Sequence, residues 1–134
     1  MPFYRRSFLC RSPFKEKPLE VGSRKWLIWQ LDIQTSRIVR QRDRKCVTCG
    51  SRRNLQCSHF YSRRYLIIRF DLRNCNAMCG RCNKRHNYDP FPYLNFMQEH
   101  YGPDVVAELH ALRMSLQKVT DDELRGLLEK YRAS

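Results

Sequence analysis

The stretches "CVTCG" (residues 46–50) and "CGRCN" (residues 79–83) decide the fold predicted for this 134-residue chain. Each contains two cysteines separated by two residues, a spacing at which a tight turn presents both thiolates to one ion. Four thiolates suit the tetrahedral geometry of Zn²⁺, and a chain of this size has a small core that a bound metal helps to stabilise. The predicted ligands of one structural zinc are Cys46, Cys49, Cys79 and Cys82.

Three further cysteines leave alternatives open. Cys75 precedes Cys79 by four residues and could replace it as a ligand, and Cys57 could form a metal-binding pair with His59. Without a metal, Cys57 and Cys75 would be ordinary buried thiols, and Cys10 has no predicted role. An odd number of cysteines, arranged partly in CxxC pairs, favours metal binding over disulfides.

The charge is divided unevenly along the chain. Residues 1–87 hold 21 Lys and Arg against 5 Asp and Glu, a balance of +16, whereas residues 88–134 hold 5 against 8, a balance of −3. Solubility alone does not require this segregation, so we predict that the basic part binds nucleic acid. The same charge disfavours a zinc-stabilised protein-interaction module.

The sequence gives no indication of a membrane association. Its longest apolar runs, "WLIW" and "YLII", have the length of core segments, and no basic amphipathic anchor with a broad apolar face is found. The first residues lack the continuous apolar segment of a secretory signal. We therefore predict a cytoplasmic protein.

The chain is expected to form a basic arm, residues 1–23, and one domain, residues 24–134. The segment 24–42 lacks Gly and Pro and repeats apolar residues at helical spacing, which predicts a long helix with Ser23 as its N-cap. Both tryptophans of this helix are expected in the core.

Residues 45–89 are expected to form a zinc-bearing ββα centre. Runs compatible with β-strands occur at "LQCSHFYS" (residues 55–62) and "YLIIRF" (residues 65–70). Residues 90–134 are expected to form a helical cap, whose first helix stops at Gly102. The second cap helix would carry on one face Val106, Leu109, Leu112 and Leu116.

A capping box formed by Thr120 and Glu123 predicts the start of the last helix. Its apolar residues lie on one stripe, as expected for a helix that packs on one side. The members of this stripe are Leu124, Leu127, Leu128 and Tyr131.

Three polar residues between and beside the CxxC pairs could supply what phosphodiester hydrolysis needs, a base for the attacking water and a cation near the leaving oxygen. An imidazole titrates near neutral pH, so His59 is the candidate general base. Asn74 would hold the ring or its backbone in place. Asn83, directly after the second pair, could offer its amide oxygen to Mg²⁺ or Mn²⁺.

These motifs resemble the NinG (Rap) recombination family of lambdoid phages over roughly residues 26–112. The similarity lies in a helix before CxxCG, the step from His59 to an aromatic residue, the "RF" before Asn74, and CxxCN. The order of His and Asn is also similar to HNH, or ββα-metal, nucleases such as phage endonuclease VII. The resemblance implies an HNH-type endodeoxyribonuclease that cleaves Holliday junctions and D-loops in the host bacterial cytoplasm.

The sequence departs from that pattern in two places. Ser58 stands before His59, where many HNH enzymes carry a carboxylate or a second histidine. In "KRHNYDPFPY", His86 is displaced by one position from the NinG-like motif, and Asp89 falls where a later Asn would stand. His86 and Asp89 are therefore candidate ligands of the catalytic metal beside Asn83. The alternatives are a DNA-facing residue for His86 and a turn residue before proline for Asp89.

Basic residues surround this predicted site in the sequence, and a nuclease must neutralise closely spaced phosphates. The predicted DNA contacts are Arg63, Arg64, Arg69, Arg73, Arg81, Lys84 and Arg85. No base-reading helix is recognisable, which favours recognition of DNA shape, and symmetric cleavage of a junction would favour a homodimer.

Together these observations predict an α+β fold with a zinc-stabilised HNH-like ββα-metal centre, a long N-terminal helix and C-terminal helices. The predicted function is a structure-selective endonuclease for branched DNA, with structural Zn²⁺ and catalytic Mg²⁺ or Mn²⁺. The alternative is a non-catalytic zinc-ribbon DNA-binding or adaptor protein, and Ser58 is the strongest argument for it.

Overall fold

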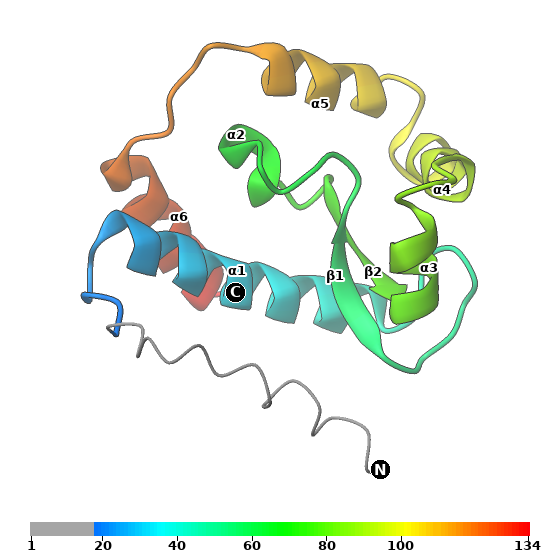
Figure 1. Ribbon diagram of the computed structural model, residues 1–134, viewed down its shortest axis with the longest axis horizontal. Coiled ribbons are helices and arrows are strands. Elements are labelled where there is room, and N and C mark those ends of the chain that lie inside the picture. Colours follow the sequence, from blue (N-terminus) through cyan, green and yellow to red (C-terminus); the bar gives the residue numbers. More distant parts are fainter. Residues whose placement is uncertain (1–17) are drawn as a thin grey trace, which may run out of the picture.

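A computed structural model describes residues 18–134, which form helices around one two-stranded antiparallel sheet (Figure 1). Cys10 and most of the predicted basic arm lie outside the described residues. The mixed helix and sheet content confirms an α+β architecture. The elements follow in the order α1 (Arg24–Asp43), β1 (Leu55–His59), α2 (Leu66–Arg69), β2 (Cys75–Cys79), α3 (Gly80–Arg85), α4 (Phe91–Tyr101), α5 (Val105–Met114) and α6 (Asp121–Arg132).

Helix α1 begins and ends close to the predicted positions. The Ser23 hydroxyl accepts a hydrogen bond from the Trp26 amide at 3.3 Å, which confirms the N-cap. Arg44 takes a left-handed φ of 60°, and its amide donates to the Arg40 carbonyl, which ends the helix. Within residues 18–134, no helix has both the length and the apolar composition that a membrane crossing would need.

One narrow stripe of α1 is buried, with residues spaced four apart: Leu27, Leu31, Thr35 and Val39. The expectation that both tryptophans lie in the core was wrong for Trp29, which is 48% exposed. Trp26 is half-buried beside α6, where the Arg132 guanidinium lies 5.5 Å from its ring centre. Trp29 falls outside the buried stripe of α1, which is the face that contacts the sheet and α6.

The sheet is a hairpin in which Leu55 lies opposite Cys79 and His59 opposite Cys75. The predicted second strand, residues 65–70, was wrong, because Leu66–Arg69 forms the short helix α2 and the strand is Cys75–Cys79. Every residue of β2 is buried, so it lacks the polar and apolar alternation by which a half-exposed strand is recognised.

The two faces of the hairpin contact different helices, because alternate strand residues point to opposite sides. Cys75 and Ala77 face α1 and cluster with Val39. The other face meets α4, where the Asn76 amide donates to the Tyr93 hydroxyl at 3.1 Å. The Tyr93 hydroxyl in turn donates to the Ser58 carbonyl at 3.1 Å.

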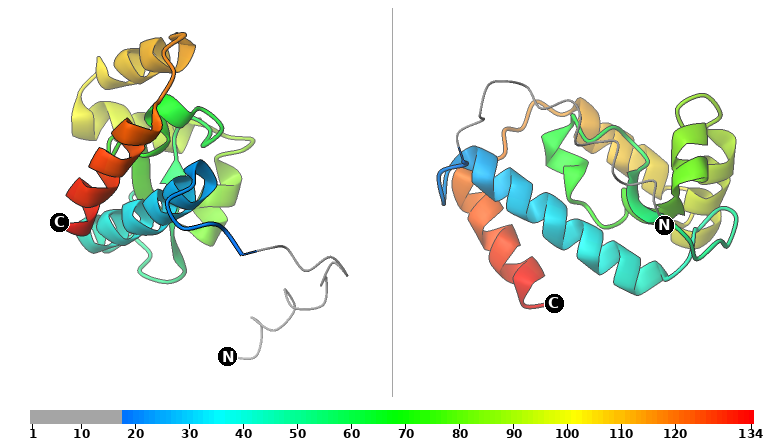
Figure 2. Two further views of the ribbon diagram at one scale, coloured as in Figure 1. Left: turned by 90° about the vertical axis from the view of Figure 1, so that its left-hand side faces the viewer. Right: turned by 60° about the horizontal axis from the view of Figure 1, so that its bottom comes forward.

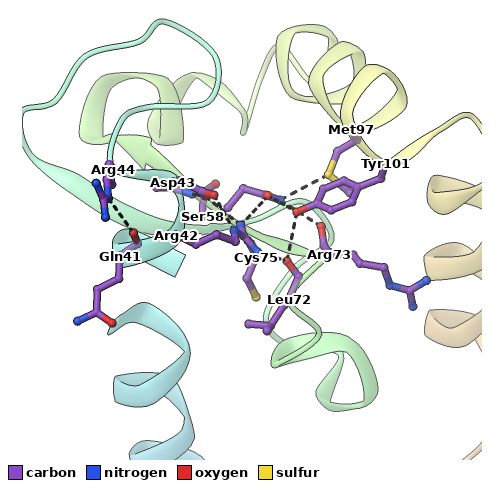
Figure 3. Close-up of polar contacts among 12 residues, drawn as sticks. Gln41, Arg42, Asp43, Arg44, Ser58, Leu72, Arg73, Cys75, Met97 and Tyr101 are labelled. Atoms are coloured by element: carbon purple, nitrogen blue, oxygen red, sulfur yellow. Dashed lines mark hydrogen bonds and ion pairs between the residues drawn. The ribbon is translucent and has the colours of Figure 1, made fainter. Parts of the chain in front are cut away.

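Hydrogen bonds from the end of α1 fix the position of β2 (Figure 3). The Arg42 guanidinium donates to the Cys75 carbonyl at 2.9 Å, and an Asp43 carboxylate oxygen accepts from the Ala77 amide at 2.7 Å. The Tyr101 hydroxyl donates to Asn76 Oδ1 at 2.7 Å. The buried polar atoms of β2 therefore find partners in α1 and α4, as buried polar groups require.

The C-terminal helices pack on different parts of the molecule, with α6 along α1 and α5 against α2 and α4 (Figure 2). The capping box is confirmed, since Thr120 Oγ1 accepts from the Glu123 amide and Glu123 accepts from the Thr120 amide. Helix α6 packs along α1, with Leu124, Leu128 and Tyr131 buried. The predicted apolar face of α5 was too long, because the helix ends at Met114 and Leu116 is 97% exposed.

Candidate functional site

The four cysteines of the CxxC pairs converge, with all four sulfur atoms within 4.8 Å of one another. Cys49 Sγ and Cys79 Sγ are 3.7 Å apart. A tetrahedral zinc with bonds of about 2.3 Å would separate its sulfur ligands by about 3.8 Å. The cluster therefore has the donor atoms and the size to hold a metal such as zinc.

Two backbone turns build this cluster. In the first, the Gly50 amide donates to the Cys46 carbonyl at 2.9 Å, and Gly50 has a φ of 76°, which a residue without Cβ adopts readily. In the second, Cys79 is the N-cap of α3, and its sulfur accepts from the Cys82 amide at 3.5 Å. Each turn thus brings two thiols to one side of the chain.

The thiols of the cluster differ in pKa because their surroundings differ. Burial disfavours ionisation of Cys46, but the Thr48 hydroxyl, 3.2 Å from the sulfur, and backbone amides together lower its pKa to about 6. Burial and the neighbouring thiols raise the pKa of Cys82 to about 12. A cation between the sulfur atoms would be needed for all four thiols to ionise together.

His59 is half-buried at the end of β1, and its Nε2 lies 3.0 Å from the Arg69 carbonyl oxygen. A carbonyl only accepts, so Nε2 carries the proton and Nδ1 carries the lone pair. Burial lowers the pKa of His59 below its ordinary value of 6.5. The imidazole is therefore held neutral, in one tautomer and one orientation.

The side chain of His59 lines a cavity of about 320 Å³ beside α1. The other residues lining it are Asp32, Thr35, Ser36, Arg40, Leu55, Gln56, Cys57 and Arg63. The cavity combines one imidazole, one carboxylate and two guanidinium groups. This composition fits a polyanion such as a phosphate chain better than an apolar ligand.

Asn74 is fully buried and fixes the segment that follows β1. Its Oδ1 accepts from the Tyr61 amide at 2.8 Å, and its Nδ2 donates to the carbonyls of Tyr61 and Ile68 at 3.1 and 3.2 Å. These bonds hold backbone atoms of Tyr61 and Ile68 and do not involve the imidazole ring of His59. Of the two roles predicted for Asn74, the contacts therefore fit positioning of the backbone rather than of the ring.

Asn83 lies on α3, and the structure does not place it against His59. The Ser58 hydroxyl donates to Asn83 Oδ1 at 2.8 Å, and consecutive residues of a strand face opposite sides. Asn83 Nδ2 also donates to Gln56 Oε1 at 2.9 Å, and Gln56 lines the cavity of His59. Gln56 thus lies between Asn83 and the cavity that His59 lines.

His86 and Asp89 lie beside the cysteine cluster instead. His86 Nε2 donates to the Phe60 carbonyl at 2.9 Å, while its buried Nδ1 has no partner within residues 18–134. Asp89 accepts from the Arg85 guanidinium at 2.9 Å and from the Phe91 amide at 3.4 Å, contacts typical of a turn residue. Both line a cavity of about 60 Å³ shared with Cys49 and Cys82.

Several of the predicted DNA-contacting arginines are held by carboxylates. Arg69 donates to both oxygens of Asp32, at 2.9 and 2.6 Å. Arg73 pairs with Asp71 and Glu108, and Arg85 pairs with Asp89. Arg63 makes a longer contact of 3.5 Å with Asp32, and Arg64 lies over the ring of Tyr65. The exposed α3 residues Arg81 and Lys84 form no ion pair with any residue that the structure describes.

Comparison with known proteins assigns the family. The family model described as "Bacteriophage Lambda NinG protein" matches residues 9–134. The chain belongs to the NinG family. Two NinG relatives, each named "Protein ninG", come from Escherichia phage 933W and Enterobacteria phage VT2-Sa. Each is 25% identical over 126 residues, which cover 90% of this chain and 62% of the relative. The chain therefore spans less than two thirds of the length of these NinG proteins, and no solved structure matches it.

Residues of α1 in this NinG family member were missed as site residues by the sequence analysis. Asp32, Ser36 and Arg40 line the His59 cavity, and their spacing of four residues places them on one helix face. That spacing was visible in the sequence. The contact of this face with β1 was not visible, because it depends on the packing of elements distant in the chain.

Proposed function

We propose that this NinG family member is a structure-selective endodeoxyribonuclease of the HNH type, which cleaves branched recombination intermediates such as Holliday junctions and D-loops. The observation that carries the proposal is the bond from His59 Nε2 to the Arg69 carbonyl. It leaves Nδ1 as a proton acceptor, and His59 lines a cavity with two guanidinium groups. A neutral, oriented imidazole beside cationic groups is what hydrolysis of a phosphodiester requires of a protein.

In the proposed reaction, His59 Nδ1 takes a proton from the water that attacks the phosphorus. Arg40 and Arg63 neutralise the phosphate in the cavity. Asn83 would supply its amide oxygen to Mg²⁺ or Mn²⁺, and this ion would stabilise charge on the leaving oxygen. Asn74 holds the backbone after β1 and so maintains the position of His59.

The open edge of β1 supports a single reaction site for His59 and Asn83. Among residues 18–134, β1 pairs with β2 alone, which leaves its other edge unpaired. Gln56 lines the His59 cavity and accepts from Asn83, so Asn83 lies close to that cavity. A DNA backbone lying across the edge would contact both residues.

Under this proposal, the zinc bound by the four cysteines is structural. It would fix β2 and α3 relative to the turn at residues 46–50, since each side contributes two thiolates. The enzyme would work in the cytoplasm of the host bacterium, and paired cuts in a junction would favour a homodimer.

A non-catalytic DNA-binding or adaptor protein is the second candidate, and one contact favours it. The hydrogen bond of Ser58 satisfies Asn83 Oδ1 without a metal, and Ser58 supplies no carboxylate beside it. A gel assay separates the two candidates. Purified protein is incubated with Mg²⁺ or Mn²⁺ and a panel of duplex, flap and four-way DNA. Cleavage of branched DNA supports the nuclease, whereas binding without cleavage under any divalent cation refutes it.

A further inference from the structure

A second group of metal-binding side chains lies outside the CxxC cluster. One sulfur each from Cys57 and Cys75 and one ring nitrogen of His59 lie within 4.8 Å of one another. The register of the hairpin explains this proximity. His59 lies directly opposite Cys75, and Cys57 is two residues earlier on the same strand, so all three side chains share the face toward α1.

We propose that Cys57, His59 and Cys75 form a second metal site that binds a thiophilic ion such as Zn²⁺, and that its occupation inhibits the nuclease. Two thiolates and one imidazole leave a fourth position open, an arrangement that zinc accepts in proteins. Sulfur ligands select Zn²⁺ over Mg²⁺ and Mn²⁺, which prefer oxygen. The proposed inhibitory ion therefore differs in chemistry from the ion that would assist cleavage.

The surroundings of the three residues are organised for such a site. The Arg69 carbonyl accepts from both His59 Nε2, at 3.0 Å, and Cys75 Sγ, at 3.2 Å, and so holds the imidazole beside the Cys75 thiol. The buried Thr35 Oγ1 has no hydrogen-bond partner among residues 18–134. Thr35 lines the same cavity as Cys57 and His59, so its hydroxyl is available to a water on the open fourth position.

The inhibitory effect rests on the proposed function of His59. The proposed base is the lone pair of Nδ1, since Nε2 donates to the Arg69 carbonyl. Zn²⁺ on Nδ1 would occupy that lone pair, and Zn²⁺ on Nε2 would move the ring proton to Nδ1. Metal binding through either nitrogen and general-base catalysis therefore exclude each other at this residue.

Metal stoichiometry tests the site without reference to activity. The 134-residue chain and its variant Cys57→Ser/Cys75→Ser are dialysed against buffered free Zn²⁺, and bound zinc is measured by elemental analysis. We expect two zinc ions per wild-type chain and one per variant chain. Cys10→Ser, which changes a thiol outside the described residues, should retain two. Circular dichroism shows whether the double variant is folded, and the single variant Cys57→Ser replaces it if it is not. One zinc in the wild type, or two in the folded variant, overturns the site.

Cleavage assays then test the regulation. At fixed Mg²⁺, micromolar Zn²⁺ should reduce branched-DNA cleavage by wild type at least tenfold and leave the thiol variant unaffected. Equal inhibition of both proteins overturns the regulatory role. If no protein cleaves DNA, the proposed nuclease function fails, while the stoichiometry still decides whether the second metal site exists.

Discussion

The Ser58 hydroxyl donates a 2.8 Å hydrogen bond to the amide oxygen of Asn83. The contact joins β1 to α3, and Ser58 is only 1% exposed. A carboxylate at position 58 would complete, with Asn83, a site for a hard cation. A buried carboxylate at this position would need a compensating charge, which a divalent ion provides.

The variant Ser58→Asp should therefore become dependent on magnesium. Without Mg²⁺ we expect a lower melting temperature than wild type, because a buried charge is unpaired. Added Mg²⁺ should raise the melting temperature of the variant more than that of wild type, and half-maximal cleavage should need about tenfold less Mg²⁺, roughly 1.4 kcal/mol of binding free energy. Ser58→Asn is the uncharged control, and an equal response of both variants to Mg²⁺ contradicts the prediction.

Loss of the proposed base should affect cleavage and little else. His59→Ala should retain the zinc of the CxxC cluster, the fold and junction binding while cleavage falls by about 10²-fold or more, the usual scale for a lost proton acceptor. Asn83→Ala should also cleave slowly, but higher Mg²⁺ or Mn²⁺ should partly restore it. His110→Ala, an exposed histidine on α5, is the matched control. Full activity of His59→Ala would assign the base to another group.

Removal of one thiol of the CxxC cluster should unfold the centre. Cys79 is a candidate metal ligand, ends β2 and caps α3, so Cys79→Ser should lose both the metal and the hairpin. Elemental analysis and circular dichroism measure these two losses. Cys10→Ser should behave as wild type. A natively folded Cys79→Ser protein would show that the metal, if present, is not structural.

Exposed cations on α3 should contribute to DNA affinity. Arg81 and Lys84 form no ion pair in the described part of the chain, so replacing both with Ala should reduce the salt dependence of binding, with a slope smaller by about 2. Fluorescence anisotropy at several salt concentrations gives the slope. The paired change Arg125→Ala/Lys130→Ala on α6 controls for net charge. An unchanged slope for the α3 variant would place the DNA elsewhere.

Local signals in the sequence predicted part of the fold correctly. The Ser23 cap, the Thr120 capping box and the stop at Gly102 each depend on residues close together in the chain. The CxxC spacing likewise identified the four thiols that converge. Such features can be read without knowledge of the tertiary structure, because the interacting groups are neighbours in sequence.

Long-range packing determined the features that the sequence did not reveal. Residues 65–70 have strand composition, yet Leu66–Arg69 forms the helix α2, whose Ile68 is buried against α5. The face of β1 on which His59 lies depends on register, since a shift by one residue exchanges the two faces. For the same reason the sequence order of His59 and Asn83 did not reveal that they lie on opposite faces of the hairpin.

The packing of α6 along α1 has a consequence for biosynthesis. The two helices are separated by roughly 80 residues, which a ribosome translating 5–20 residues per second adds in about 4 to 16 s. During that interval Leu27 and Leu31 lack the leucines of α6 that bury them in the folded protein. The nascent chain therefore exposes an apolar face of α1 beside a highly basic segment. Chaperones that recognise such surfaces could bind this face before α6 has been synthesised.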